Sequence, residues 1–392
     1  MTVMKFGGSS VGGAEQIRKV CAIIEDSQQP IVVVSAVSGV TDLLLESAYN
    51  AKKGEETAVE KIKEKHLNII LELGLEENLV EKELDELSVA VKGVELLGEL
   101  TDRTLDKITS FGEVISSKIV AAVLQKDGYN ARAYTGGEAG IITDSCHTCA
   151  NPLKTSYAEI REKLSGLEHI PVISGFIAED ENREITTLGR GGSDLTASII
   201  GSALNTGEIQ IWSAVDGIMT SDPRVCPGAR QLEEVTFREA AELAYFGAKI
   251  LHPRTLQPAM QSNIPVVVKN TFNPENKGTR IVSSKSGKEA VTGIAFKKNM
   301  TAFSIESARM LDAHGFLRKI FSVFDEYKTS VDVVTTSEVN VSLTLDDSSN
   351  AEKIKNKLNE LGRTEYNTNY SVICVVGEGL AKNPANIGRI IS

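Results

Sequence analysis

Hydrophobic residues over the first 50 positions follow two different periodicities. Thr2–Phe6 and the apolar run that begins at Pro30 have the length and composition of strands, and an uninterrupted apolar run is typical of a strand buried in a parallel sheet. Between them, apolar residues recur every three or four positions over Ala14–Glu25, which predicts a helix, and another helix is expected from Thr41. This βαβα order indicates an α/β layer fold.

Residues 52–100 have a different character, because they are dense in Glu and Lys at helical spacing and contain no strand signal. We interpret them as a helical insertion or lid with a solvated, charged face. The α/β pattern then resumes with a helix at 107–126. We expect further strands at 130–134, 139–142, 170–174, 208–213 and 264–269, one arm of a hairpin at 181–187, and helices at 193–204, 236–247 and 249–260.

A polar stretch rich in Gly, Ser and Lys, residues 277–289, is the expected boundary after a first domain at 1–285. The pattern beyond it has the order βαββαβ, which predicts a ferredoxin-like module at 290–368. Its pieces are strands at 291–296, 301–306, 331–335, 339–345 and 364–368 and helices at 315–327 and 351–361. Residues 369–392 resemble the start of a second such module, and the chain is expected to stop before completing it.

Composition narrows the class of protein. The 392 residues predict two to three domains, and 42 basic against 53 acidic residues give a net charge of −11, which argues against a nucleic-acid binder. Five cysteines do not form a disulfide framework in a chain of this length. We see no secretion signal and no apolar run long enough for a membrane span, so we expect a cytoplasmic protein.

The first candidate for chemistry is a glycine turn after the first strand, Lys5-Phe6-Gly7-Gly8-Ser9-Ser10. Glycines let the backbone approach a phosphate, and the following helix N-terminus offers free N–H groups, while Lys5 would place a positive charge on the transferring group. An ordinary glycine turn is the alternative. The motif fits neither the Walker loop nor the dinucleotide fingerprint.

A second glycine turn, Thr187-Leu188-Gly189-Arg190-Gly191-Gly192-Ser193-Asp194, also precedes a predicted helix. The planar guanidinium of Arg190 suits a carboxylate. Ser193 and Asp194 could instead simply cap the helix. A cap requires one such residue, whereas this turn has three glycines and an arginine, so a binding role is favoured.

Other polar residues carry weaker signals. Glu113 lies among small residues in a helix, where it could face a ligand amine or be an ordinary exposed carboxylate, and the loop at 213–225 follows a strand, where α/β sheets bind ligands. Trp212 is expected to pack in the core. Cys146-His147-Thr148-Cys149 is the only CxxC sequence, so we do not expect a structural zinc site, and we predict no metal ligands elsewhere.

Taken together, these motifs resemble those of the aspartokinases in the amino-acid kinase superfamily, whose fold is a three-layer αβα sandwich with a mostly parallel sheet. The matches run in family order over nearly the whole chain: KFGGSS at 5–10, SAVSGVTD at 35–42, SFGE at 110–113, TTLGRGGSD at 186–194, DGIMTSDPR at 216–224 and FGAKILHPRTL at 246–256.

The resemblance implies transfer of a phosphoryl group from MgATP to the β-carboxylate of L-aspartate. Because both reactants are anionic, the step depends on positioning and charge neutralisation, and a carboxylate needs no base at pH 7.

By motif, the residues acting on the phosphoryl group would be Lys5, Gly7, Gly8 and Asp194. The aspartate would be held by Thr41, Glu113, Arg190, Gly191, Gly192 and Ser193. The nucleotide would lie along Ser9, Ser35, Ser213, Ala214, Met219, Asp222, Arg224, Lys249 and Ile250. The sequence departs from the family at Ala214 and Met219, where an aspartate and an aromatic residue are usual, so these positions bear on nucleotide affinity.

The C-terminal part resembles the ACT modules of lysine-sensitive aspartokinases, which implies a lysine effector and a homodimer or homotetramer formed through these modules. The implied effector residues are Met310, Ala313, Phe316, Leu317, Ser330, Val331, Asp332, Ser337 and Glu338. Ala313 replaces a serine that is common in that pocket, and the alternative is a module that only dimerises. A non-catalytic amino-acid sensor that keeps the kinase fold is the alternative for the whole chain.

Overall fold

The computed structural model describes residues 1–246, 251–285, 290–311, 314–380 and 384–391. It divides into two compact units, Met1–Thr292 together with Gly377–Ser392, and Gly293–Val376. Each unit is described separately below.

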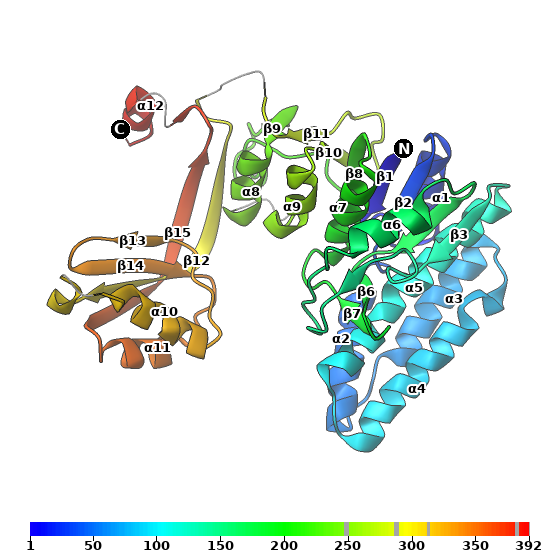
Figure 1. Cartoon of the computed structure of the whole chain (residues 1–392), viewed down its shortest axis with the longest axis horizontal. Helices are drawn as coiled ribbons and strands as arrows, with labels where there is room; N and C mark the ends of the chain where they lie inside the picture. Colours follow the sequence, from blue (N-terminus) through cyan, green and yellow to red (C-terminus); the bar gives the residue numbers. More distant parts are fainter. Residues whose placement is uncertain (247–250, 286–289, 312–313, 381–383, 392) are drawn as a thin grey trace. The chain divides into compact units, whose positions relative to one another are not determined.

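An eight-stranded sheet forms the centre of the first unit, in the order β3-β5-β2-β1-β8-β10-β11-β9 (Figure 1). Neighbouring strands are parallel except for β10 and β11, which are antiparallel. The strands are β1 (Thr2–Phe6), β2 (Pro30–Val34), β3 (Ala131–Tyr134), β5 (Ile170–Ser174), β8 (Glu208–Ser213), β9 (Glu234–Thr236), β10 (Val266–Asn270) and β11 (Thr279–Val282). The carboxyl ends of β1, β2, β5 and β8 lie at the same edge of the sheet because these strands are parallel, and the first glycine turn follows β1 at this edge.

Helices cover both faces of this sheet, which gives the expected three-layer αβα arrangement. α1 (Ala14–Glu25) and α5 (Asp102–Lys126) contact each other, and α5 packs on β2, β3 and β5. α7 (Gly192–Leu204) packs on β1, β2 and β8, and its neighbours are α6 (Ser156–Leu164) and α9 (Pro253–Gln261), with α8 (Phe237–Phe246) against α9. A small sheet, β4 (Ile142–Thr143), β6 (Ile177–Asp180) and β7 (Ile185–Thr187), lies beside α5.

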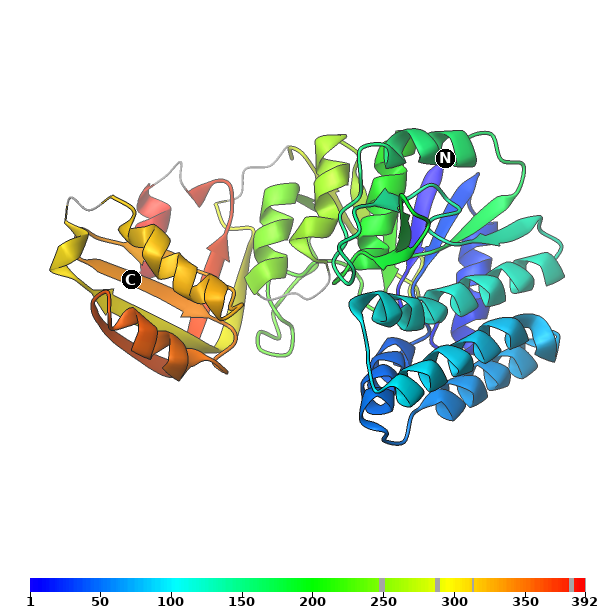
Figure 2. The same ribbon diagram turned by 60° about the horizontal axis from the view of Figure 1, so that its bottom comes forward.

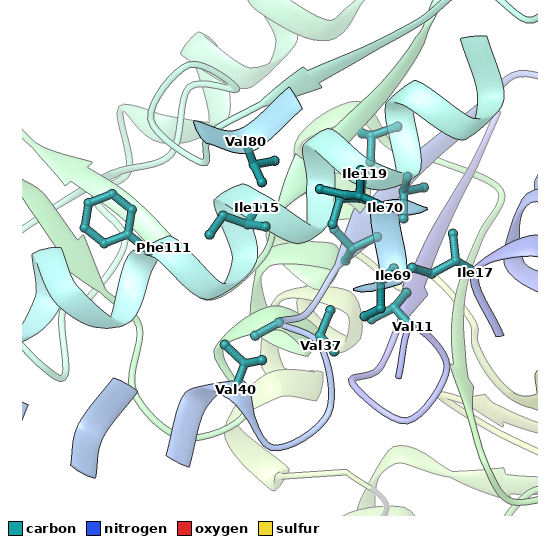
Figure 3. Close-up of a cluster of buried hydrophobic side chains, with 14 of the residues drawn as sticks. Val11, Ile17, Val37, Val40, Ile69, Ile70, Val80, Phe111, Ile115 and Ile119 are labelled. Carbon is teal, nitrogen blue, oxygen red and sulfur yellow. The ribbon is translucent and has the colours of Figure 1, made fainter. Parts of the chain in front are cut away.

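The insertion at 52–100 is a helical layer that shares the main core. It contains the end of α2 (Val40–Lys53), α3 (Val59–Leu73), a short 3₁₀ turn at Glu77–Val80 and α4 (Glu81–Leu97). α3 and α4 lie along α2 and α5 in both views (Figures 1 and 2). Their apolar sides join residues of α1, α2 and α5 in one buried cluster (Figure 3). The charged face predicted from the sequence is therefore the solvent side of a helix layer that is part of the core.

α5 is long and apolar enough to cross a membrane by length and composition, but most of its apolar window is buried inside the first unit. Its buried residues pack against the sheet on one side and the insertion on the other, so it is the central helix of the core.

The second unit has a four-stranded antiparallel sheet in the order β13-β14-β12-β15, and Figure 1 shows two helices covering one of its faces. This βαββαβ arrangement agrees with the ferredoxin-like prediction. Its elements are β12 (Gly293–Glu306), a 3₁₀ turn at Ala308–Met310, α10 (Phe316–Glu326), β13 (Val334–Thr336), β14 (Asn340–Leu345), α11 (Ala351–Leu358) and β15 (Arg363–Val376).

The longest strands of this unit cross the division that we expected near residue 368. β15 continues to Val376, and its second half pairs with Gly293–Lys297 at the start of β12. Residues 369–376 therefore extend a strand of this sheet, and α12 (Pro384–Ile391) follows it.

Several short elements differ from the sequence prediction. The predicted strand at 139–142 is mostly a turn, because Ala139, Gly140 and Ile141 donate their amide hydrogens back to residues 135–137, and β4 begins only at Ile142. α6, β6, β9 and β11 were not predicted; β11 falls inside the polar stretch that we took as the domain boundary. α9 begins at Pro253, after the cap residue His252, and not at 249.

Candidate active site

A cavity of about 580 Å³ opens at the carboxyl end of β1 and β2, between α2, α5 and α7. It is lined by residues from both glycine turns and from the three helices. Those that matter for chemistry are Lys5, Gly8, Ser35, Thr41, Asp106, Glu113, Thr148, Arg190, Gly191, Gly192, Ser193 and Asp194. Residues nearly 190 positions apart in the sequence thus share one wall.

Two helix N-termini point their first turns into this cavity. α2 begins after Gly39 and α7 after Gly191, both glycines are left-handed, and in the structure neither helix has a side-chain cap. Uncapped amides at a helix N-terminus attract anions, since they donate hydrogen bonds and carry the positive end of the helix dipole. The alternative in which Ser193 or Asp194 caps α7 does not apply, because Gly191 occupies that position.

Two of the glycines are fixed by close approach. A Cβ at Gly191, whose φ is +72°, would lie 2.9 Å from the Thr255 side chain. A Cβ at Gly8 would lie 2.9 Å from the carbonyl oxygen of Ala36. The first glycine turn therefore packs directly on the segment after β2, so the motif at 5–10 lies against the motif at 35–42.

Lys5 and Asp194 form an ion pair of 2.6 Å at the base of the cavity, with side chains only 11% and 12% exposed. Lys5 lies near the end of β1 and Asp194 in the first turn of α7, so the pair joins the two glycine turns. Because burial weakens solvent screening, the Lys5 ammonium is held in place and remains directed at the cavity.

Glu113 is fully enclosed on α5, with 4% of its surface exposed. Burial raises its pKa from 4.5 to about 8, opposed by a hydrogen bond from the Ala36 amide and by the charge of Lys5. Its Oε2 atom has no hydrogen-bond partner among the described residues. A buried carboxyl oxygen without a donor, on the wall of a cavity, is suited to accept a hydrogen bond from a ligand cation.

Arg190 lies at the mouth of the cavity and is exposed. Burial is the main cause that lowers the pKa of His252, and the charge of Arg190 lowers this pKa further, so the two side chains are near each other. No ion pair of Arg190 occurs in the described part of the chain, which leaves its guanidinium available to an anionic ligand. The cavity thus combines two cations, two helix N-termini and three buried acids, Asp106, Glu113 and Asp194.

The family model for the "Amino acid kinase family" matches residues 1–270. The chain is 31% identical to the Escherichia coli aspartokinase III crystallised with aspartate and ADP. The match covers 98% of this chain and 89% of that one, with a TM-score of 0.83. The chain belongs to the aspartokinases.

Two further likenesses are informative. The same Escherichia coli enzyme in complex with lysine and aspartate is 30% identical, with a TM-score of 0.82 over 96% of this chain and 87% of that one. Aspartokinase 2 of Arabidopsis thaliana, a chloroplastic protein, is 45% identical over 88% of this chain. The chain spans just under two thirds of the length of the plant aspartokinases that it matches, 63–66%.

The structure brings together the six residues of this aspartokinase that we predicted to bind the substrate aspartate, since all six line the cavity. Of the residues predicted to act on the phosphoryl group, Lys5, Gly8 and Asp194 line it as well. The Gly7 amide, in contrast, donates to the Trp212 carbonyl at 3.1 Å and ties the turn to the end of β8. Trp212 is 3% exposed and stacks on Phe6, so it is a core residue as expected.

Of the described residues predicted to bind the nucleotide, most do not line the cavity, and Ser9 is among these. Ser35 is a lining residue, while Ser213 and Ala214 follow β8, the strand next to β1. Met219 pairs with Gln231 in a bridge that folds the following loop back on itself. Arg224 forms an ion pair with Asp222 at 2.8 Å and is 88% exposed. Lys249 and Ile250 lie outside the described residues.

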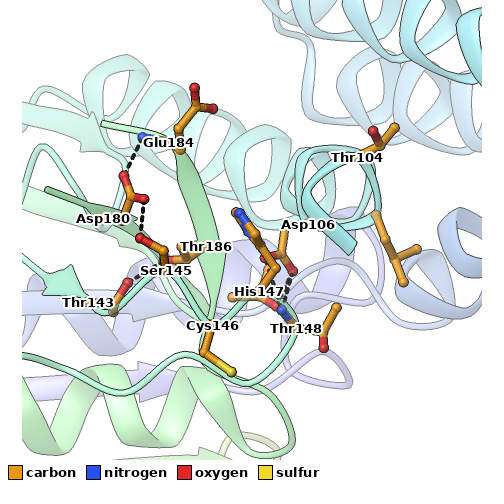
Figure 4. A network of polar contacts seen from close by, with 12 residues as sticks. Thr104, Asp106, Thr143, Ser145, Cys146, His147, Thr148, Asp180, Glu184 and Thr186 are labelled. Carbon is orange, nitrogen blue, oxygen red and sulfur yellow. Dashed lines mark hydrogen bonds and ion pairs between the residues drawn. The ribbon is translucent and has the colours of Figure 1, made fainter. Parts of the chain in front are cut away.

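Sequence reasoning missed Asp106, which is 1% exposed and organises one wall. His147 Nδ1 donates to it at 2.9 Å and the Thr148 amide at 3.0 Å (Figure 4). The Thr187 hydroxyl donates to it at 2.6 Å. Asp106 lies two helical turns before Glu113 on α5 and thus on the same face, which is the signal that would have found it.

The predicted effector residues divide between core and surface in the second unit. Phe316 is buried in the unit's core, and Met310 and Val331 pack against it. Leu317, Ser330, Ser337 and Glu338 are exposed. The Asp332 side chain is only 4% exposed and forms an ion pair with Lys297 at 3.5 Å. Ala313 lies outside the described residues.

Among the described residues, no group of three or more His, Cys, Asp or Glu side chains is placed to hold a metal ion. Magnesium in phosphoryl transfer is held largely by the phosphates of the nucleotide and by water. The donor set of the cavity is therefore compatible with a metal that enters as part of MgATP.

Proposed function

We propose that this protein phosphorylates the β-carboxylate of L-aspartate with MgATP, giving 4-phospho-L-aspartate and ADP. The single observation that carries the proposal is that Lys5, Arg190 and Glu113 line one cavity together with two uncapped helix N-termini, and that Glu113 Oε2 has no hydrogen-bond partner among the described residues. An amino acid with two carboxylates and one ammonium matches these groups in number and sign.

Each end of aspartate has a counterpart. The Arg190 guanidinium would bind the α-carboxylate through two parallel hydrogen bonds, while Glu113 would accept from the α-ammonium, with Thr41 and Ser193 beside them. The β-carboxylate then lies toward Lys5. The family likeness supports this arrangement, because the aspartokinase of similar fold was crystallised with aspartate and ADP.

The chemical step requires little beyond placement. The ionised β-carboxylate is already a nucleophile at pH 7, so no residue has to remove a proton. Lys5, held by Asp194 at 2.6 Å, stabilises charge on the transferring phosphoryl group, and the Gly8 amide faces the same space. Magnesium supplies further charge neutralisation on the phosphates. The nucleotide would extend from Ser35 toward the loop after β8.

The proposal is tested by ADP release from purified protein with ATP, Mg²⁺ and either L-aspartate, L-glutamate or no acceptor. We expect release with aspartate and not with glutamate. Arg190 directly precedes α7 and Lys5 is paired with Asp194 in its first turn at 2.6 Å, so one extra methylene would displace the second carboxylate. Release with glutamate at an equal rate would replace this proposal with a broader carboxylate kinase.

We further propose that L-lysine regulates the enzyme through the second unit, with Asp332 accepting the effector's α-ammonium. The observation behind this proposal is that the nearly enclosed Asp332 carboxylate already pairs with an ammonium group of the protein, that of Lys297 at 3.5 Å. Support comes from the related aspartokinase crystallised with lysine.

Lysine at millimolar concentration should lower activity and raise the melting temperature. Asp332→Asn should abolish both effects. Asp346→Asn is the matched control, since Asp346 pairs with the same Lys297 at 2.5 Å but is 56% exposed, and it should respond as the wild type does. No effect of lysine on the wild-type protein would remove the regulatory proposal and leave the catalytic one standing.

A further inference from the structure

The CxxC sequence, which the catalytic proposal does not use, lies in a loop on the cavity wall. Asp144 and Asn151 close this loop, with two hydrogen bonds from Asn151 to the Asp144 carboxylate at 2.9 and 3.0 Å. Within it, the Sγ atoms of Cys146 and Cys149 lie 3.3 Å apart, and both side chains are exposed. The two thiols are therefore in contact and accessible from solvent.

The residues between the two cysteines connect them to the proposed aspartate site. His147 and the Thr148 amide donate two of the hydrogen bonds that Asp106 accepts, and Thr148 and Asp106 both line the cavity (Figure 4). The Thr148 carbonyl lies within 3.2 Å of the position that a Cβ on Gly189 would take, so the loop also packs on the turn that carries Arg190.

Backbone strain is concentrated at the same place. Thr148 has a φ of +68°, a left-handed conformation that is unfavourable for a β-branched residue. The hydrogen bonds to Asp106 compensate for this conformation in the dithiol form. A small change in the loop can therefore release Thr148 from it.

The other described cysteines lack this arrangement. Cys21 is buried, and burial raises its pKa to about 12, so it is inert. Cys226 is exposed. Its sequence neighbourhood holds no second cysteine. No third metal ligand lies near Cys146 and Cys149 among the described residues, which leaves thiol chemistry as their use.

We propose that Cys146 and Cys149 form a reversible disulfide whose formation weakens binding of the amino-acid substrate; the effect on catalysis rests on the function proposed above. The oxidant is a small disulfide of the glutathione class. One cysteine thiolate attacks it and releases one glutathione thiol, and the second cysteine then attacks the mixed disulfide and releases the other. The protein loses two electrons and two protons, and the small disulfide becomes two thiols.

Closing the disulfide requires the sulfur atoms to approach from 3.3 Å to about 2.05 Å. Only His147 and Thr148 lie between the cysteines, so the contraction falls on the two residues that hydrogen-bond to Asp106. Asp106 then loses donors while 1% exposed, and the cavity wall shifts beside Arg190. Beyond β8, Ser213, Met219 and Arg224 interact with Val215, Gln231 and Asp222, which lie outside this loop, so we expect the affinity for ATP to stay unchanged.

The test incubates the full chain with oxidised glutathione, followed by mass spectrometry and by kinetics with each substrate varied. We expect the loss of two hydrogen atoms within the peptide containing 146–149 and a rise of about tenfold in the aspartate KM, equivalent to about 1.4 kcal/mol, with the ATP KM constant. Dithiothreitol should reverse both changes. Calorimetric titration of aspartate should show the same loss of affinity.

Cys146→Ser with Cys149→Ser should bind aspartate normally and keep that affinity after treatment with the oxidant. If the double variant folds poorly, either single substitution should gain the mass of one glutathione, removable by dithiothreitol, and form no disulfide within the loop, because one thiol cannot resolve the mixed disulfide. Cys226→Ser is the control that should respond as the wild type does. The inference is overturned if no intraloop disulfide forms, or if it forms and aspartate affinity does not change. A reduced protein that binds aspartate but releases no ADP would instead contradict the catalytic proposal.

Discussion

At the scale of single residues, the site separates binding from chemistry. Arg190 is exposed at the mouth of the cavity and Lys5 is buried at its base. We predict that Arg190→Ala raises the aspartate KM by about 30-fold or more, equivalent to about 2 kcal/mol, with little change for ATP. Arg224→Ala, on the proposed nucleotide side, should do the opposite. Equal effects of Arg190→Ala on both substrates in initial-rate kinetics would contradict the assignment.

Lys5 should affect the rate of phosphoryl transfer and not the affinities for aspartate and ATP. We expect Lys5→Ala to lower kcat by about 100-fold or more with both KM values within a few-fold, since it removes a charge that matters most in the transition state. The measurement is kcat under saturation with both substrates. An unchanged kcat would exclude Lys5 from the chemistry.

Glu113 makes the site sensitive to pH. Burial raises its pKa to about 8, so the free enzyme holds it largely protonated at neutral pH, and the ammonium of aspartate requires the ionised form. We predict that kcat/KM for aspartate rises with pH up to about 8 and that Glu113→Gln flattens this profile and weakens binding.

The same shift predicts an opposite effect on stability. Between the unfolded pKa of 4.5 and about 8, the unfolded chain is ionised at Glu113 while the folded protein retains the proton or buries a charge, so stability falls as pH rises. Glu113→Gln should therefore raise the melting temperature at pH 8 more than at pH 5. A uniform loss of stability at both pH values would show that the acid is not strained by burial.

Much of the site could be predicted from the sequence because the glycine turns carry dense local signals. Arg190, Glu113 and Lys5 come from such motifs, and the cavity unites them. For Asp106 the sequence offered only its position two helical turns before Glu113, since the partners that reveal its role lie 41 to 81 positions away. The engaged amide of Gly7 likewise depends on the carbonyl of Trp212, on a strand far along the chain.

At the scale of elements, long periodic segments were predictable and short ones were not. α1 and β1 match their predicted bounds because their apolar periodicity is complete. β9 and β11 have three and four residues, too few for a period, and each is fixed by pairing with the other. The turn at 136–140 leads into a segment whose apolar residues Ala139 and Ile141 resemble a strand, but its three glycines permit the backbone to curl.

The insertion gives a direct test of the shared core. Leu87 of α4 is fully buried and Val89, on the same helix, is 72% exposed. We predict that Leu87→Ala lowers the free energy of unfolding by about 2–5 kcal/mol, while Val89→Ala changes it by about 0.5 kcal/mol or less. Equal, small effects in urea denaturation would indicate a separate lid.

At the scale of the whole molecule, one buried acid joins the chain segments on either side of the second unit. Glu239 on α8 accepts from Lys285 at 2.9 Å, Thr292 at 2.6 Å and the Glu378 amide at 3.3 Å. Burial alone would raise its pKa, but these donors and Thr236 hold the pKa below the ordinary value. All four partners belong to the first unit, so this network holds together segments of that unit that precede and follow residues 293–376 in the sequence.

We predict that Glu239→Gln destabilises the first unit by about 3 kcal/mol, because it leaves Lys285 buried without its charge partner. An acid whose pKa is lowered by folding stabilises the fold at pH values above its unfolded pKa. The difference in stability between wild type and variant should therefore shrink as pH falls below about 4.5. Scanning calorimetry checks both points, and a variant as stable as the wild type at neutral pH would contradict them.

The central claim is that the cavity transfers phosphate to the β-carboxylate of aspartate, and trapping the acyl phosphate with hydroxylamine tests it most directly. With ATP, Mg²⁺ and saturating L-aspartate, the wild-type protein should give the β-hydroxamate, and Lys5→Ala should give little. If the wild-type protein binds aspartate but forms no hydroxamate, the catalytic account is wrong and a non-catalytic amino-acid sensor explains the site.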